Sequence, residues 1–132
     1  MTKHEAKFCT KLEKWLIHNL KETCFIEAKI SMGDEPFNFK SGFKPHQLNN
    51  LINIRRGPFV YKISDLDQME KPLDMFYAYK AVSYVAMQWV RPKNKVFYLI
   101  EPAEIVKLIE LGKKSIDEKV AMVVCSIRGE LK

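Results

Sequence analysis

Apolar residues recur at helical spacing near the start of the chain and then change to strict alternation. The first set falls on one helix face and consists of Phe8, Cys9, Leu12, Trp15, Leu16 and Leu20. Thr2 and Glu5 have the spacing of a capping box, so we expect this helix to begin after Thr2 and to run to about Leu20. From residue 24 to residue 31 the apolar positions alternate with others, which predicts a strand with one face in the core.

The rest of the chain predicts short strands and helices in turn. We expect a strand over 37–40, a helix from about Pro45 to the Arg-Arg-Gly-Pro stop at 55–58, and a strand over 59–63. Pro72 predicts the start of a helix through Tyr79, and residues 84–90 and 95–100 predict a hairpin; the alternative is a single helix over 72–90. A helix over 101–111 and a strand over 119–127 follow. This order predicts an α+β fold in which helices cover a small mixed sheet.

The length of 132 residues and the 47% hydrophobic content predict a single domain, 1–132. No apolar run reaches the ~18–20 residues of a membrane helix, and the first residues lack the apolar stretch of a signal peptide. We therefore expect no membrane association and a cytoplasmic location (the host cytoplasm if the protein is viral). The three cysteines have no CxxC spacing and the three histidines lie far apart, which argues against a disulfide framework or a zinc site.

An excess of 22 basic over 16 acidic residues gives a net charge of +6, which favours a polyanionic partner such as DNA. The alternative is an ordinary lysine-rich surface. Four basic residues flank the second predicted helix and are candidates for phosphate contacts: Lys40, Lys44, Arg55 and Arg56. Lysine pairs at 93 and 95 and at 113 and 114 extend this set. Four aromatic residues are expected in the core or in a dimer interface rather than as base-stacking platforms: Tyr77, Tyr79, Tyr84 and Trp89.

The strand over 24–31 carries the most informative chemistry. Its period of two places Glu27 and Lys29 on one face, ~6.6 Å apart along the strand. A carboxylate holds Mg²⁺, and a neighbouring lysine orients a water or stabilises charge on a phosphate, which together suit phosphodiester hydrolysis. The alternative is a surface Glu/Lys pair on an amphipathic strand.

Two segments, Phe25-Ile26-Glu27-Ala28-Lys29 and Phe43-Lys44-Pro45-His46-Gln47, resemble the PD-(D/E)XK nuclease superfamily. The resemblance is nearer to its RecU-like Holliday-junction resolvases, in which an F-E-A-K strand precedes an F-x-x-H-Q helix start. It implies a restriction-endonuclease-like core and a homodimer that cuts branched DNA with Mg²⁺ or Mn²⁺. It also implies that Glu27 and Lys29 are catalytic, that Glu27 binds the metal, and that Gln47 supports the site from the following helix.

A second metal ligand is expected on the first helix. Superfamily members often carry a glutamate near the start of this helix, with apolar residues three, four and seven positions later, and Glu5 has this pattern. The alternative role of Glu5 is the capping box alone. The family's metal-binding aspartate lies on a strand that this chain lacks, because only residues 21–23 separate the first helix from the ExK strand. Either the metal site is incomplete or another acid substitutes, the candidates being Glu5, Glu13, Glu22 and Asp34.

The sequence is therefore compatible with three functions. The first is a metal-dependent DNA endonuclease of the resolvase type. The second is a catalytically inactive nuclease-fold module that binds DNA or a protein. The third is an unrelated α+β interaction module.

Overall fold

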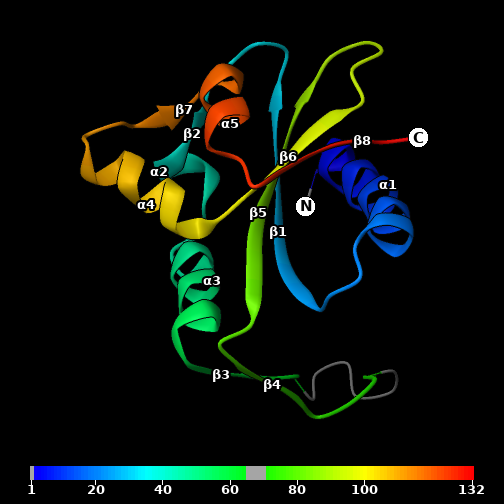
Figure 1. Cartoon of the computed structure of the whole chain (residues 1–132), viewed down its shortest axis with the longest axis vertical. Coiled ribbons are helices and arrows are strands. Elements are labelled where there is room, and N and C mark those ends of the chain that lie inside the picture. Colours follow the sequence, from blue (N-terminus) through cyan, green and yellow to red (C-terminus); the bar gives the residue numbers. More distant parts are fainter. Residues whose placement is uncertain (1, 65–70) are drawn as a thin grey trace.

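A four-stranded mixed sheet forms the centre of the fold (Figure 1). The computed structural model describes residues 2–64 and 71–132. The strand order is β1 (Cys24–Met32), β5 (Val82–Val90), β6 (Val96–Ile100) and β8 (Ile127–Glu130). β1 runs parallel to β5 over its whole length, whereas β5–β6 and β6–β8 are antiparallel. The ExK strand β1 therefore lies at one edge of the sheet.

Helix α1 (Lys3–Asn19) covers one face of this sheet. Its N-terminus is capped as the sequence predicts, because the Thr2 hydroxyl oxygen accepts a hydrogen bond of 3.1 Å from the Glu5 amide. Phe8 and Leu12 are buried against apolar side chains of the sheet, among them Ala86, Phe97 and Leu99. The alternating residues Cys24, Ile26, Ala28 and Ile30 of β1 pack into the same cluster, which leaves Glu27 and Lys29 for the other face of the strand.

The opposite face is covered by α3 (Gln47–Arg56), α4 (Pro102–Glu110) and α5 (Glu118–Val124). A small β2 (Phe37–Asn38) and β7 (Ser115–Ile116) pair completes this layer, together with the single turn α2 (Phe39–Gly42). The core on this side contains the completely buried side chains of Trp89, Ile100 and Ile105. The molecule is thus an α+β fold whose mixed sheet is flanked by helices.

A separate two-stranded ribbon extends beyond α3 at the end of the molecule away from the β5–β6 turn (Figure 1). It pairs β3 (Pro58–Lys62) with β4 (Met75–Tyr79) in antiparallel register. Tyr77 and Tyr79 are 66% and 59% exposed, whereas Tyr84 and Trp89 are buried in β5. The expected core position is therefore confirmed for Tyr84 and Trp89. Tyr77 and Tyr79 do not lie in the core, and the alternative expectation for them, a dimer interface, stays a prediction.

Most predicted elements are confirmed within one to three residues. These are the first helix, the ExK strand, the second helix, the third strand, the β5–β6 hairpin and the helix after Glu101. The single helix proposed over 72–90 is excluded, because this part of the chain forms β4 and β5. No helix in the described parts of the chain is long and apolar enough to cross a bilayer.

Three local predictions are wrong. The helix from Pro72 to Tyr79 is strand β4, which pairs with β3 and buries Ala78. The strand over 119–127 is helix α5, because the Asp117 carboxylate caps the Val120 amide at 2.9 Å and Ala121 fits into the core. The strand over 37–40 ends at Asn38, whose side chain caps α2 by accepting from the Ser41 amide.

Candidate functional site

Glu27, Lys29 and Gln47 form a hydrogen-bonded group at the edge of the sheet. Glu27 Oε1 lies 3.4 Å from Lys29 Nζ and accepts a hydrogen bond of 2.9 Å from Gln47 Nε2. The three residues come from one strand and from the first turn of α3. The sequence-predicted carboxylate, ammonium and amide therefore meet around a single oxygen atom.

The surrounding structure fixes each member of this group. Period two of β1 sends Glu27 and Lys29 to the side of the sheet that α2 and α3 cover. The Lys29 ammonium lies 5.7 Å from the centre of the Phe43 ring, and the residue is only 6% exposed. The Lys44 amide donates a hydrogen bond of 2.9 Å to Gln47 Oε1, which orients the Gln47 amide so that its NH₂ group points to Glu27. A buried lysine needs such partners, since burying an unpaired ammonium is costly.

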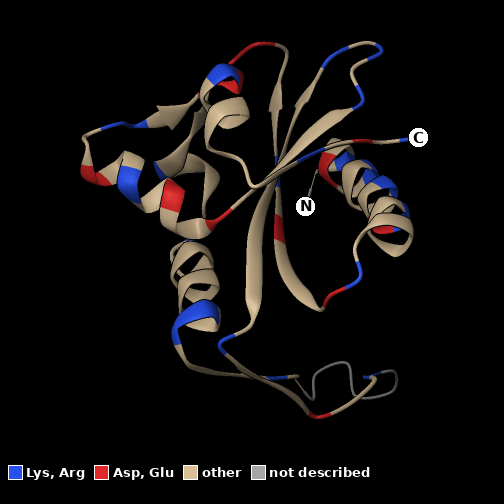
Figure 2. Cartoon of the chain, in the orientation of Figure 1, with Lys and Arg blue, Asp and Glu red and all other residues tan. Residues whose placement is uncertain are grey.

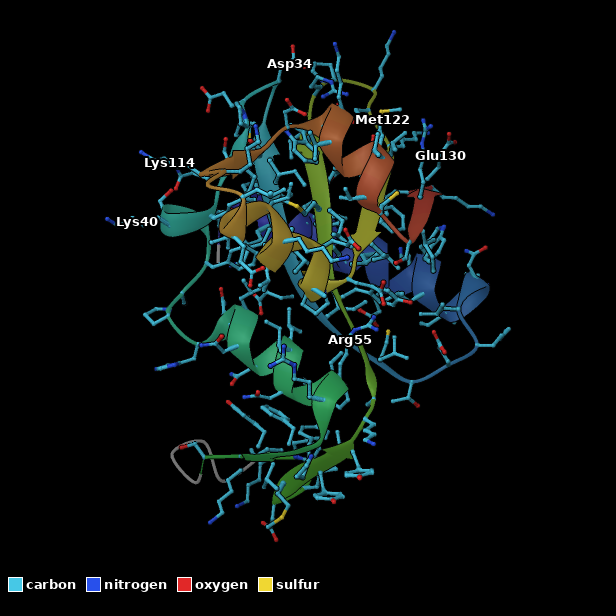
Figure 3. All side chains as sticks on the ribbon, turned by 60° about the vertical axis from the view of Figure 1, so that its left-hand side comes forward. Asp34, Lys40, Arg55, Lys114, Met122 and Glu130 are labelled. Carbon is cyan, nitrogen blue, oxygen red and sulfur yellow. The ribbon has the colours of Figure 1, made fainter. Side chains whose placement is uncertain are left out.

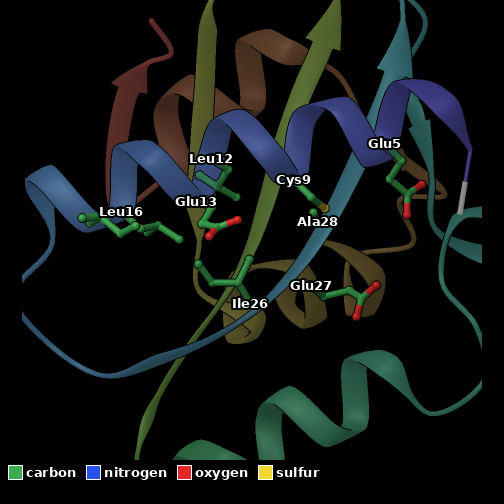
Figure 4. Close-up of a pocket in the computed structure, with 9 residues that line it drawn as sticks. Glu5, Cys9, Leu12, Glu13, Leu16, Ile26, Glu27 and Ala28 are labelled. Atoms are coloured by element: carbon green, nitrogen blue, oxygen red, sulfur yellow. The ribbon is translucent and has the colours of Figure 1, made fainter. Parts of the chain in front are cut away.

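Glu27 also lines a groove of about 400 Å³ between α1 and β1, here called the acidic groove (Figure 4). Glu5 and Glu13 line it from α1, and Glu5 and Glu27 lie toward the same end with Cys9 near them. Burial and the charges of Glu5 and Glu27 raise the pKa of the Cys9 thiol. Both carboxylates therefore act electrostatically on the same sulfur atom.

A second groove of about 560 Å³ runs along the other side of β1, between α3 and the β3–β4 ribbon. Glu27 and Gln47 contribute its polar end, and Phe25, Phe59 and Phe76 contribute apolar wall. Glu27 is thus reached from two directions along the edge of β1.

The donor chemistry of the acidic groove fits a hard cation. Mg²⁺ in proteins often takes only one or two carboxylates and completes its shell with waters and substrate phosphates. Glu5 and Glu27 supply two carboxylates, and Glu13 lines the same groove. Within the described residues no group of three or more His, Cys, Asp or Glu side chains is arranged to hold a metal ion. Asp34 lies elsewhere, 3.4 Å from Arg91 at the far end of β1.

The four basic residues predicted to contact DNA occupy different environments. Lys40, Lys44 and Arg56 are exposed, and Lys40 lies beside Lys114 at one edge of the molecule (Figure 3). Arg55 instead donates to the Ser83 carbonyl at 2.6 and 2.9 Å and to Glu101 at 2.8 Å. The Arg55 guanidinium therefore links α3 to β5 and to the start of α4.

A basic groove lies on the other side of α1; the sequence indicated its lysines at 93 and 95 as candidate phosphate contacts, but not those of α1. It lies between α1 and the β5–β6 turn and is lined by Lys7, Lys11, Lys93 and Lys95. The signal was present, because Lys3, Lys7, Lys11 and Lys14 are spaced three or four residues apart and so share a helix face. Figure 2 shows this basic stripe along α1 together with the basic β5–β6 turn.

Comparison with models of protein families, with curated proteins and with solved structures gave no match to this chain.

Proposed function

We propose that this protein is a metal-dependent DNA endonuclease of the Holliday-junction-resolvase type, which hydrolyses phosphodiesters in branched or otherwise structured DNA. The observation that carries the proposal is the Glu27–Lys29–Gln47 group, in which one carboxylate oxygen contacts an ammonium at 3.4 Å and an amide at 2.9 Å. The proposal includes a restriction-endonuclease-like core and a homodimer. It takes these from the resemblance of residues 25–47 to the PD-(D/E)XK nucleases.

Each residue has a defined task in this proposal. Glu27 and Glu5 would hold Mg²⁺ or Mn²⁺, which when bound polarises a phosphate oxygen and supplies a reactive water. Gln47 fixes the orientation of the Glu27 carboxylate from the α3 side through the 2.9 Å hydrogen bond to Oε1. Lys29 places a fixed positive charge beside Glu27, in a position largely shielded from water. A preorganised charge of this kind stabilises negative charge that develops on a phosphate.

The test is cleavage of labelled four-way-junction, duplex and single-stranded DNA, with Mg²⁺, with Mn²⁺ and with a chelator. We expect metal-dependent cleavage that Lys29→Met lowers by ~10²–10³-fold, since such a group contributes about this factor. Met keeps most of the buried volume, and Lys119→Met at an exposed position of α5 serves as the control. DNA binding should change little in Lys29→Met, because one lysine accounts for about one phosphate contact. Cleavage at the wild-type rate in Lys29→Met would contradict the assignment.

A second candidate function is a nuclease-fold module without catalysis that binds DNA or a protein. Two observations favour it: the described residues contain no group of three acidic, His or Cys side chains arranged to hold a metal, and Lys29 is already paired with Glu27. Absence of cleavage on every DNA and metal combination, with DNA binding retained, would select this module over the nuclease.

A further inference from the structure

The basic groove beside α1 has the properties of a polyanion site. Four lysines line it from two elements: Lys7 and Lys11 from α1, and Lys93 and Lys95 from the β5–β6 turn. The groove has a volume of about 480 Å³, and its lining contains no Asp or Glu among the described residues. All four lysines are exposed, so their charges are available to a ligand.

The β5–β6 turn that carries two of these lysines is held rigidly. Asn94 Nδ2 donates to the Trp89 carbonyl at 2.6 Å, and the Asn94 carboxamide oxygen accepts from the Val96 amide at 3.2 Å. The Leu131 amide donates to the Lys95 carbonyl at 2.8 Å, which ties the turn to the end of the chain. Lys93 itself has a left-handed φ of 65°, a conformation in which Gly or Asn is ordinarily favoured. The turn thus presents its lysines from a fixed backbone.

The nearest other cation does not add to the free charge of the groove. Arg91 lies in the lining, but its guanidinium contacts Glu118 at 2.7 Å and Asp34 at 3.4 Å. One guanidinium faces two carboxylates, so this cluster adds no positive charge to the groove. None of the four lysines forms an ion pair with a described residue, so the positive charge of the groove is theirs. Gln88, only 8% exposed, adds a polar side chain at the floor.

Helix α1 separates this lysine groove (Lys7, Lys11, Lys93 and Lys95) from the acidic groove of Glu5 and Glu27. We propose that the lysine groove binds the phosphate backbone of DNA a short distance from the phosphate that reaches Glu27. This inference rests on the proposed nuclease function and specifies where the DNA lies on the protein. A helix with its side chains is ~10–12 Å across, which corresponds to about three base-pair steps of 3.4 Å. One DNA molecule is therefore long enough to contact both grooves.

The test measures how the affinity for a fluorescein-labelled DNA duplex of about 20 base pairs depends on salt concentration. Each phosphate contact contributes about −0.9 to the slope of log K against log salt. Two double variants remove the two halves of the groove: Lys7→Gln with Lys11→Gln, and Lys93→Asn with Lys95→Gln. We expect each to make the slope less steep by about 2. The control, Lys107→Gln with Lys119→Gln, removes the same charge from exposed positions on α4 and α5 and should leave the slope nearly unchanged.

The possible outcomes separate this inference from the proposed function. If the wild type binds and cleaves DNA while both groove variants behave like the control, the lysine groove is not the DNA site and the nuclease proposal stands. A change in only one of the two groove variants also overturns the inference, because a single backbone track requires both walls. If the wild type binds no DNA at low salt, the inference and the DNA-directed function both fail. Circular dichroism establishes that each variant is folded.

Discussion

At the scale of single residues, the candidate site depends on how charges are distributed around Glu27. The Lys29 ammonium and the Gln47 amide approach the same oxygen from the α3 side, whereas Cys9 and Glu5 lie on the α1 side. Glu27 is thus neutralised by Lys29 on the α3 side, whereas on the α1 side Glu5 and Glu13 form no ion pair with a described residue. A cation that binds Glu5 and Glu27 in the acidic groove would also act on the Cys9 thiol, whose pKa both carboxylates affect.

Cys9 offers a test of metal binding that does not depend on catalysis. Its pKa is raised by burial and by the carboxylates of Glu5 and Glu27, so little thiolate is present at pH 8. A divalent cation bound by these carboxylates cancels their effect and lowers the pKa of Cys9. We therefore expect saturating Mg²⁺ to increase the rate at which iodoacetamide alkylates Cys9, measured by mass spectrometry of each cysteine peptide.

Cys125 is the internal control for this measurement. Burial raises its pKa, but neither Glu5 nor Glu27 is among the groups that affect it. Glu27→Gln should speed Cys9 alkylation without metal and remove most of the Mg²⁺ effect, because one charge and one metal ligand are lost. Equal Cys9 rates with and without Mg²⁺ in the wild type would show that the metal does not bind beside Glu27.

At the scale of elements, helices and strands with a regular apolar pattern could be predicted from the sequence. Elements whose type depends on a cap or on a distant strand could not. The alternation of β1 placed Glu27 and Lys29 on one face, and the structure brings their charged groups within 3.4 Å. The apolar run near the end of the chain suggested a strand, yet the Asp117 cap and the fit of Ala121 in the core produce α5. The segment that forms β4 was predicted as a helix that begins at Pro72. It is a strand because it pairs with β3, and such a contact between distant residues cannot be seen in a local pattern. The 3.1 Å cap by Thr2 and the contact between Gln47 and Glu27 agree with the motif reasoning.

The attachment of α5 to the β5–β6 hairpin leads to a prediction about stability. Glu118 accepts hydrogen bonds from Arg91 at 2.7 Å and from Tyr98 at 2.8 Å. Burial alone would raise the pKa of Glu118, but these hydrogen bonds and the charge of Arg91 lower it below its ordinary value of 4.5. The ionised carboxylate therefore stabilises the fold above pH 4.5, and this contribution is lost as the pH falls toward the lowered value.

Glu118→Gln should reduce the free energy of unfolding at pH 7 by roughly 1–3 kcal/mol, as expected for hydrogen bonds to a charged group. Its free energy of unfolding should also fall less steeply than that of the wild type as the solution is acidified below pH 4.5. Urea titrations at several pH values measure both effects. Glu104→Gln, which removes an exposed-surface ion pair with Lys107, is the matched control and should change stability by less than ~1 kcal/mol. Parallel pH dependences of Glu118→Gln and the wild type would refute the assigned role.

At the scale of the whole molecule, the most unusual surface is the exposed β3–β4 ribbon. Val60, Met75, Tyr77 and Tyr79 lie on one face of it by strand alternation, and all are at least 50% exposed. A two-stranded hairpin has little stability in water by itself, and aromatic side chains with Met are enriched in protein interfaces. The homodimer included in the proposed function therefore has a specific candidate surface in this face of the ribbon.

We expect the protein to sediment as a dimer, and the double variant Tyr77→Lys with Tyr79→Lys to sediment as a monomer. Truncating or charging a buried interface tyrosine commonly costs at least ~1–2 kcal/mol, so two such changes weaken a dimer by ~30-fold or more. The control is Leu111→Lys with Val123→Lys, which adds the same charge directly after α4 and on α5, at residues that are 75% and 84% exposed. The control should remain a dimer, because these side chains lie outside the ribbon. A wild type that stays monomeric at high micromolar concentration, or a control that dissociates equally, would remove the ribbon as the dimer surface, whereas the chemistry assigned to Glu27 and Lys29 would be unaffected.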